Sequence, residues 1–443
     1  MGGNRHLSKP VLLAYAALAF PLAALTMPVY IFLPTFYAED LGLGFSLVGI
    51  TLLLARIWDV ITDPVVGILG DATKNRLGRR KTWILGGLIP TILGTWFLMN
   101  PPGDLEGTGG ALYLLLASAV LYLGWTCMIL SLQAWGAELS TDYHERSRIS
   151  AWREAFTVGG ILGTLALLAV LGFGSTDTAG QSLSFIAWLT AILLPLTVFT
   201  CLKFVPEPEI IKSSKITFKS GLKVLANNKS FRLLVIAYLI NGIANGLPAT
   251  LFILFVRHIL DEPEYVNQLL FLYFLCGFLA VPLWLKLSYH FGKHIVWCGA
   301  MIWACVFFLL VPFVGSGDIW LYTAIVVLTG ISLGADLVLP AAMQADVVDV
   351  DTLETGQQRT GLYFAIWGMV TKLSLALAAG LAFPALDAAG FSGEENQNLW
   401  ALVTLYALIP IGFKAVAIAL MLKYPLKQKT VDKVRSEIIQ KWG

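Results

Sequence analysis

Twelve long apolar segments dominate this chain of 443 residues, and their length restricts the folds that it can adopt. A run of about 20 apolar residues is long enough to cross the hydrocarbon layer of a membrane as an α-helix. Because a helix satisfies its own backbone hydrogen bonds, a helical bundle is the expected arrangement. The chain is therefore predicted to be an all-α membrane protein with twelve transmembrane helices. The segments span residues 11–38, 45–70, 83–99, 111–139, 149–173, 183–202, 233–256, 269–285, 295–314, 319–345, 361–386 and 399–422.

Lysine and arginine alternate between the two sides of the predicted membrane. The amino-terminal segment, the even-numbered connections and the carboxy-terminal tail hold 25 of the 30 basic residues, whereas the odd-numbered connections hold only Arg257. Positive charge concentrates on the cytoplasmic side of membrane proteins. We therefore expect a multi-pass protein of the cytoplasmic (inner) membrane with both termini in the cytoplasm. The first apolar segment lacks the pattern of a cleaved signal peptide and is predicted to be the first span.

Composition excludes several classes of protein. Apolar residues make up 57% of the chain, which is more than in an ordinary soluble globule. The five cysteines lie within apolar segments without CxxC spacing, which argues against disulfides and a cysteine-based metal site. The net charge of +2 carries no indication of nucleic-acid binding. Neither a catalytic constellation nor a nucleotide-binding loop is recognisable, so we expect a protein that is not an enzyme, has no cofactor, and is driven by a Na⁺ or H⁺ gradient.

The longest polar interruption divides the chain into two sets of six spans. Six spans on each side of a basic linker suggest two related bundles around a central cavity. We predict an amino-terminal six-helix bundle over residues 1–204, a cytoplasmic linker over 205–230, a carboxy-terminal six-helix bundle over 231–426 and a cytoplasmic tail over 427–443.

The second predicted span contains charged residues, which are unfavourable in the hydrocarbon layer of a membrane. Arg56, Asp59 and Asp63 are spaced by three and four residues, so they share one helical face. A charge at mid-bilayer costs roughly 2.5–3.5 kcal/mol, and such residues usually face a functional cavity. Two carboxylates one turn apart, with the Thr62 hydroxyl nearby, form an oxygen-rich site that either Na⁺ or a proton can neutralise. The alternative is an internal Arg56–Asp59 salt bridge, with Asp63 as a polar residue at the helix end.

Further polar residues lie inside other spans. Lys372, next to Thr371, lies midway along the eleventh span and is expected to approach the paired carboxylates; the alternative is a side chain that reaches the membrane interface. Asp336 on the tenth span is either a substrate group or a partner of Lys372. Several other side chains are candidates for the lining of a binding cavity or for bonds between helices. They are Tyr30, Gln133, Trp135, Arg153, Asn241 and Asn245. Glu138 is expected to serve helix packing, and Lys414 either to be structural or to reach the membrane interface.

Four ordered motifs resemble those of the glycoside–pentoside–hexuronide:cation symporters, the melibiose permease family of the major facilitator superfamily. The basic loop after the second span, Gly70-Asp71 to Lys81, also resembles the signature loop of that superfamily. The motifs are Arg56-Ile-Trp-Asp59-Val-Ile-Thr62-Asp63-Pro64, Ala137-Glu138 to Arg146 with Trp152-Arg153, Ala345-Asp346 to Asp351, and Gly361-Leu-Tyr363 leading to Thr371-Lys372.

The resemblance implies a major facilitator fold and roles for individual residues. Asp59, Asp63 and Thr62 would bind the coupling cation, Thr126 would complete that site, and Lys372 and Arg56 would couple it to transport. The substrate would lie near Tyr30, Gln133, Trp135 and Arg153, and Asp336 and Thr371 are added as further candidates. The implied partners are a small-molecule solute, a coupling cation and membrane lipids, with a functional monomer.

Two departures from the family pattern bear on the substrate. The acidic residues that recognise galactosides are matched here by Ala23 and Ile129, which argues against melibiose. Arg153 is kept, so an anionic solute such as a uronide is easier to accommodate. We expect a symporter of a glycoside, a uronide or a related sugar-like solute. The alternative is a cation-coupled transporter of lysophospholipids or other amphiphiles, which some relatives of this family carry.

Overall fold

The computed structural model describes residues 7–73, 75–103, 105–140, 143–171, 179–207, 228–355, 360–391 and 398–426. These residues form helices and connecting segments without a strand, and twelve of the helical segments are long and apolar enough to cross a membrane. The predicted all-α architecture and the number of spans are therefore confirmed.

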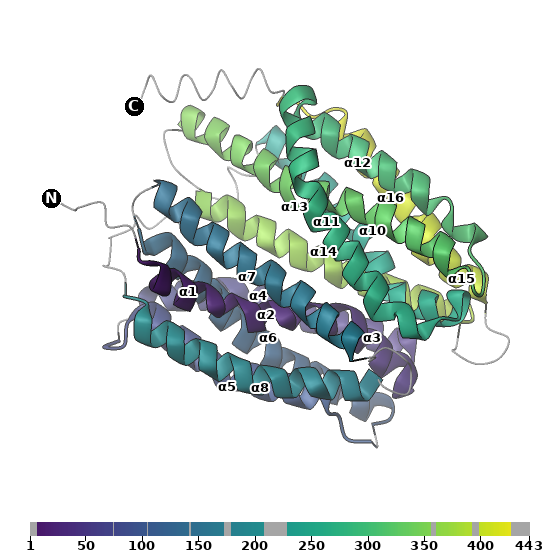
Figure 1. Cartoon of the computed structure of the whole chain (residues 1–443), viewed down its shortest axis with the longest axis horizontal. Coiled ribbons are helices and arrows are strands. Elements are labelled where there is room, and N and C mark those ends of the chain that lie inside the picture. Colours follow the sequence, from purple (N-terminus) through teal and green to yellow (C-terminus); the bar gives the residue numbers. More distant parts are fainter. Residues whose placement is uncertain are drawn as a thin grey trace.

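The spans follow one another along the chain and are arranged as in Figure 1. The first is built from short pieces: α1 (Lys9–Ala17), α2 (Ala19–Ala24), α3 (Leu33–Thr35) and the π-helical turns Pro28–Phe32 and Phe36–Asp40. The others in the amino-terminal half are α4 (Phe45–Ala72), α5 (Arg79–Met99), α6 (Gly107–Glu138), α7 (Tyr143–Val170) and α8 (Ala179–Phe204). The carboxy-terminal half comprises α10 (Lys229–Phe255), α11 (Val266–Phe291), α12 (Lys293–Phe308), α13 (Ile319–Thr355), α14 (Thr360–Ala388), α15 (Leu399–Val403) and α16 (Ile409–Met421).

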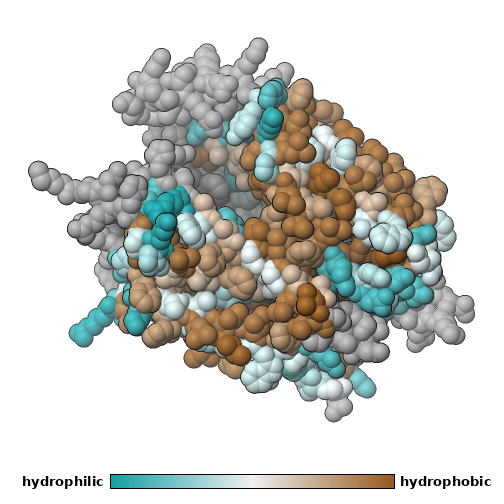
Figure 2. All heavy atoms as spheres, in the orientation of Figure 1, coloured by the Kyte–Doolittle hydropathy of each residue, from teal (hydrophilic) through white to brown (hydrophobic). Residues whose placement is uncertain are grey.

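The two halves lie side by side, with α1–α8 toward the lower left of Figure 1 and α10–α16 toward the upper right. Most of the predicted linker (residues 208–227) and the predicted tail (427–443) lie outside the described residues, so the domain boundaries stay predictions. On the face shown in Figure 2, apolar side chains cover most of the described surface and hydrophilic ones gather toward the ends of the helices. Large apolar side chains such as Ile68 (67% exposed) and Phe199 (64%) suit contact with lipid.

One end of the bundle carries acidic connections, and here the two halves are in contact. Arg257, in the helical turn that follows α10, donates to Glu39 at 2.7 Å and to Asp40 at 2.9 Å, and His258 also bonds to Glu39. We call these four residues the acidic-end latch. Next to it, the ring of Phe45 lies 5.5 Å from the ring of Phe391.

A glycine permits a close crossing of α4 and α14 below the latch. A Cβ atom at Gly49 would lie 2.9 Å from the Cβ of Phe383 and from the ring of Pro384. Because carbon atoms do not approach so closely, any larger residue at this position must push the two helices apart. The acidic end of the bundle is thus closed by apolar packing as well as by charge.

The opposite end of the bundle carries the basic connections. Arg80 at the start of α5 donates to Glu138 at the end of α6 at 2.6 Å, and Lys293 of α12 donates to Asp346 of α13 at 2.6 Å. Each of these pairs joins two helices of the same half. Glu138 therefore has the structural contact that the sequence suggested.

Candidate functional site

The paired carboxylates of α4 face α6 and share one hydroxyl group. The hydroxyl of Thr126 lies 3.0 Å from Asp59 Oδ1 and 2.9 Å from Asp63 Oδ1. Thr126 is 2% exposed and Asp59 3% exposed, so this cluster is buried. The spacing of four residues places both acids on one face, and the crossing of α6 brings Thr126 to it. The oxygen atoms of three side chains thus converge at this point.

A lysine from the other half of the molecule completes the cluster. The ammonium group of Lys372, in α14, donates to Asp59 Oδ1 at 3.0 Å and to an oxygen of Asp63 at 2.7 Å. Its side chain is 23% exposed, compared with 4% for Asp59 and 14% for Asp63. This ion pair therefore joins the two halves through the interior of the bundle. It is the contact between Lys372 and the acids that the sequence suggested.

Arg56 lies on the other side of Asp59. Its guanidinium donates to Asp59 Oδ2 at 3.3 Å and lies between the rings of Tyr30 and Tyr122, 4.1 and 4.0 Å from their centroids. Cation–π contacts on both faces stabilise a buried guanidinium that has one carboxylate partner. The internal Arg56–Asp59 pair considered from the sequence forms, and Asp63 shares the Thr126 hydroxyl with Asp59 instead of being only a polar residue at a helix end. Tyr122 was not predicted, because nothing in the sequence places α6 beside Arg56.

The other predicted site residues are dispersed. The Thr62 hydroxyl donates to the backbone carbonyl of Asp59 at 3.0 Å rather than to a carboxylate. Trp135 is fully buried at the basic end, where its indole donates to the carbonyl of Pro206, so it lies apart from the carboxylate pair. Thr371 bonds to the Tyr238 hydroxyl at 3.1 Å, Arg153 pairs with the adjacent Glu154, and the side chain of Gln133 is exposed.

Asp336 belongs to a second polar cluster, inside the carboxy-terminal half. It accepts hydrogen bonds from Asn241 and Asn245 of α10, both at 2.9 Å, and from the indole of Trp297 at 2.6 Å. Lys414 of α16 donates to the side-chain amide oxygens of the same two asparagines, and its ammonium lies 4.0 Å from Asp336. The charged neighbour of Asp336 is therefore Lys414 rather than Lys372, the partner considered from the sequence. The spacing of four residues between the asparagines was the available signal for this cluster.

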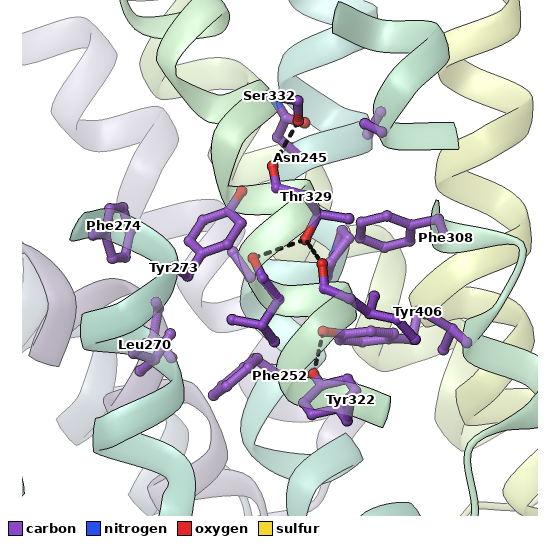
Figure 3. A pocket seen from close by; sticks show the side chains of 18 of the residues that line it. Asn245, Phe252, Leu270, Tyr273, Phe274, Phe308, Tyr322, Thr329, Ser332 and Tyr406 are labelled. Carbon is purple, nitrogen blue, oxygen red and sulfur yellow. Dashed lines mark hydrogen bonds between the residues drawn. The ribbon is translucent and has the colours of Figure 1, made fainter. Parts of the chain in front are cut away.

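Two adjoining cavities lie beside these clusters. The smaller, of about 40 Å³, is lined from both halves by Tyr30, Arg56, Tyr122 and Ala249, among others. The larger, of about 70 Å³, lies mainly in the carboxy-terminal half and is walled by aromatic rings from several helices (Figure 3). Ala249 lines both cavities, and Ile31 of the amino-terminal half also lines the larger one. The larger cavity therefore adjoins the neighbourhood of Arg56 at the boundary between the halves.

The carboxylate cluster is suited to hold a small monovalent cation. Carboxylate and hydroxyl oxygens are the ligands that hard cations prefer. In the part of the chain that the structure describes, no group of three or more His, Cys, Asp or Glu side chains is arranged to hold a metal ion. The negative charge of the two carboxylates can be balanced by one monovalent cation or one proton instead of the Lys372 ammonium, and the hydroxyl adds a further oxygen.

Twelve spans in two halves and a charge cluster that joins the halves across the bundle define a secondary transporter of the major facilitator type. The comparisons with known proteins agree: the family described as MFS/sugar transport protein matches residues 14–428, and the chain belongs to this family. The proteins of this family are transporters and not enzymes, and the fold class expected from the sequence is confirmed.

Among relatives, the chain is 25% identical to a sodium-dependent lysophosphatidylcholine symporter 1-A of Danio rerio, over 86% of this chain and 79% of that protein. It is 23% identical to the putative glycoside/cation symporter YagG of Escherichia coli, over 91% and 89%. Among solved structures, a point mutant of the nucleoside transporter NupG superposes with a TM-score of 0.65 at 13% identity, covering 94% of this chain and 98% of that one. A bacterial homologue of the iron transporter ferroportin, in its inward-facing state, gives 0.66 at 12% identity, covering 94% and 97%.

Proposed function

We propose that this protein is a cation-coupled symporter in which Asp59, Asp63 and Thr126 bind Na⁺ or a proton that moves together with a solute. The observation that carries this proposal is the position of Lys372, whose ammonium lies between the two carboxylates of the other half. The family and the names of both relatives, which are symporters, support it.

The coupling step follows from competition between two cations for one pair of acids. A Na⁺ ion or a proton that neutralises Asp59 and Asp63 weakens their attraction for Lys372. Because this attraction joins the halves, its loss changes the relative stability of the two orientations of the halves. Arg56 stays bound to Asp59 and holds that carboxylate in place. By linkage, a solute that favours the cation-loaded arrangement also raises the affinity for the cation.

The orientation in the membrane is part of the proposal. The basic end would face the cytoplasm of a cell whose inner membrane holds the protein, with both termini inside. The acidic-end latch would then close the outer side, and the halves predicted over residues 1–204 and 231–426 would rock about the carboxylate cluster. A single chain provides the complete cluster, which supports a functional monomer surrounded by lipid.

The solute we propose is a glycoside, a uronide or a related sugar-like molecule, as the description of the family suggests. A lysophospholipid or other amphiphile is the second candidate. It is favoured by the mainly apolar wall of the larger cavity and by the buried Ala23 at the place of a sugar-binding acid. Of the predicted solute-binding residues, Tyr30 lines a cavity, and Arg153, Gln133 and Thr371 remain candidates for other stages of transport.

Thermal stabilisation of the purified chain tests the proposal. Glycosides, uronides and lysophospholipids are added with and without Na⁺ at constant pH and ionic strength, and then across pH without Na⁺. We expect one class to stabilise the wild type, more strongly when Na⁺ or protons are added, and Asp63→Asn to lose this dependence. A ligand that stabilises both proteins equally, whatever the cation, would contradict cation coupling.

A further inference from the structure

Among the described residues, Lys414 is the one charged side chain that lines the larger cavity. Its side chain is 6% exposed. Its ammonium donates to Asn245 at 2.7 Å and to Asn241 at 2.9 Å, both through neutral amide oxygens. An ammonium has three N–H donors. The third donor of Lys414 forms no hydrogen bond with a described residue.

The acid of this cluster is already satisfied. Asp336 accepts hydrogen bonds from two amides and from the indole of Trp297, and it lies 4.0 Å from Lys414, beyond hydrogen-bond distance. Asp336 does not line the cavity, whereas Lys414 and Asn245 do. Both asparagines thus bond to both members of this ion pair, and only its positive member lines the cavity.

The rest of the cavity wall suits a solute that carries an anionic oxygen. Its lining residues, all of them described, include Lys414 but no Asp or Glu. Tyr273 lines the cavity as well (Figure 3). Its hydroxyl has no hydrogen-bond partner among the described residues. Phe252, Phe308 and Tyr406 supply aromatic faces on which a ring or an apolar chain can pack.

We propose that this cavity is a solute subsite in which Lys414 and Tyr273 bind an anionic oxygen, a carboxylate or a phosphate, while the aromatic rings hold the body of the solute. We call it the Lys414 subsite. It shares the lining residue Ala249 with the cavity beside Arg56. The inference rests on the proposed function, because it concerns the solute of that symporter. It assigns to Lys414 a role in solute binding in addition to its contacts within the helix bundle.

The test compares pairs of ligands that differ in the anionic group. One pair is 4-nitrophenyl β-glucuronide and 4-nitrophenyl β-glucoside; the other is oleoyl lysophosphatidic acid and monooleoylglycerol. Dissociation constants are measured on the full chain in lipid nanodiscs. We expect the anionic member of one pair to bind at least about tenfold more tightly, which is about 1.4 kcal/mol. The pair that shows this preference distinguishes a carboxylate sugar from a lipid phosphate.

Two variants assign the preference to the subsite. Lys414→Gln combined with Asp336→Asn keeps the net charge of the cluster unchanged. In this double variant we expect the anionic and the neutral member of the pair to bind with about equal affinity. Tyr273→Phe leaves the charge cluster intact and should reduce the preference at least about threefold, because a hydrogen bond to a charged group is lost. If the double variant does not fold, the Tyr273→Phe result decides.

The outcomes separate the two proposals. A wild type that is stabilised by a cation but binds both members of each pair equally, or not at all, would overturn the subsite alone. So would a preference that both variants retain. A wild type without any response to Na⁺ or pH would instead overturn the proposed cation coupling.

Discussion

Replacing Lys372 by glutamine should have two opposite effects that together identify its role. Without the ammonium, Asp59 and Asp63 keep only Thr126 as a shared donor, and Arg56 contacts only one of them. The cation-free protein is therefore expected to become less stable. Added Na⁺, in contrast, no longer has to displace a tethered ammonium, so it should bind more tightly.

The structure gives the size of the first effect. Breaking a buried ion pair by removing one partner costs about 3–5 kcal/mol. Because the Lys372 side chain is 23% exposed, we expect the lower value of about 3 kcal/mol. For a cooperative unit of roughly 200 residues, this corresponds to a melting temperature lower by about 6 °C or more.

The assay is thermal unfolding of the purified protein in a titration with NaCl at constant ionic strength. Lys423→Gln is the matched control, because this lysine is exposed beyond the end of α16. We expect Lys372→Gln to melt below the wild type without Na⁺ and to gain more stability from Na⁺. A variant that melts at the wild-type temperature, with the same Na⁺ midpoint, would refute competition between the ammonium and the ion.

Three further changes test the cluster and the closed end. Thr126→Val removes the hydroxyl that both acids share and should weaken cation binding at least about tenfold in a Na⁺ titration; an unchanged midpoint would exclude it as a ligand. Gly49→Ala should prevent closure at the acidic end and strongly lower solute uptake. Gly67→Ala is the control, because it lies on the same helix with open space around it and should leave uptake unchanged. Equal uptake by the two variants would contradict this. Arg257→Gln removes the cation of the acidic-end latch. A cysteine placed at Ala249 should then react about tenfold more with an impermeant thiol reagent added on the acidic side. Unchanged labelling would show that the latch is not needed for closure.

Much of the carboxylate cluster could be predicted from the sequence because its main signal is local. Arg56, Asp59 and Asp63 lie on one helix, where their spacing fixes which face they share. Charges inside an apolar segment need partners, and this requirement made Lys372 a candidate partner before any helix was placed. The twelve spans were predictable for the same reason, because length and apolar composition determine a transmembrane helix.

Apart from the Lys372 contact, the contacts between distant helices were harder to predict. Trp135 was expected in a substrate cavity, yet the rotation of α6 buries it against Pro206. Asp336 was considered as a partner of Lys372, whereas the packing of α10, α13 and α16 surrounds it with two asparagines and Lys414. These outcomes depend on how helices are rotated and staggered, which the apolar pattern of a membrane helix fixes only weakly.

The most direct test of coupling is the uptake of the stabilising solute into proteoliposomes under an inward Na⁺ or H⁺ gradient. Wild type and Asp63→Asn are compared, with an ionophore that collapses the gradient as the control. We expect the wild type to concentrate the solute only while the gradient lasts, and Asp63→Asn not to concentrate it at all. Undiminished accumulation by Asp63→Asn would contradict the assignment of the paired carboxylates as the coupling site.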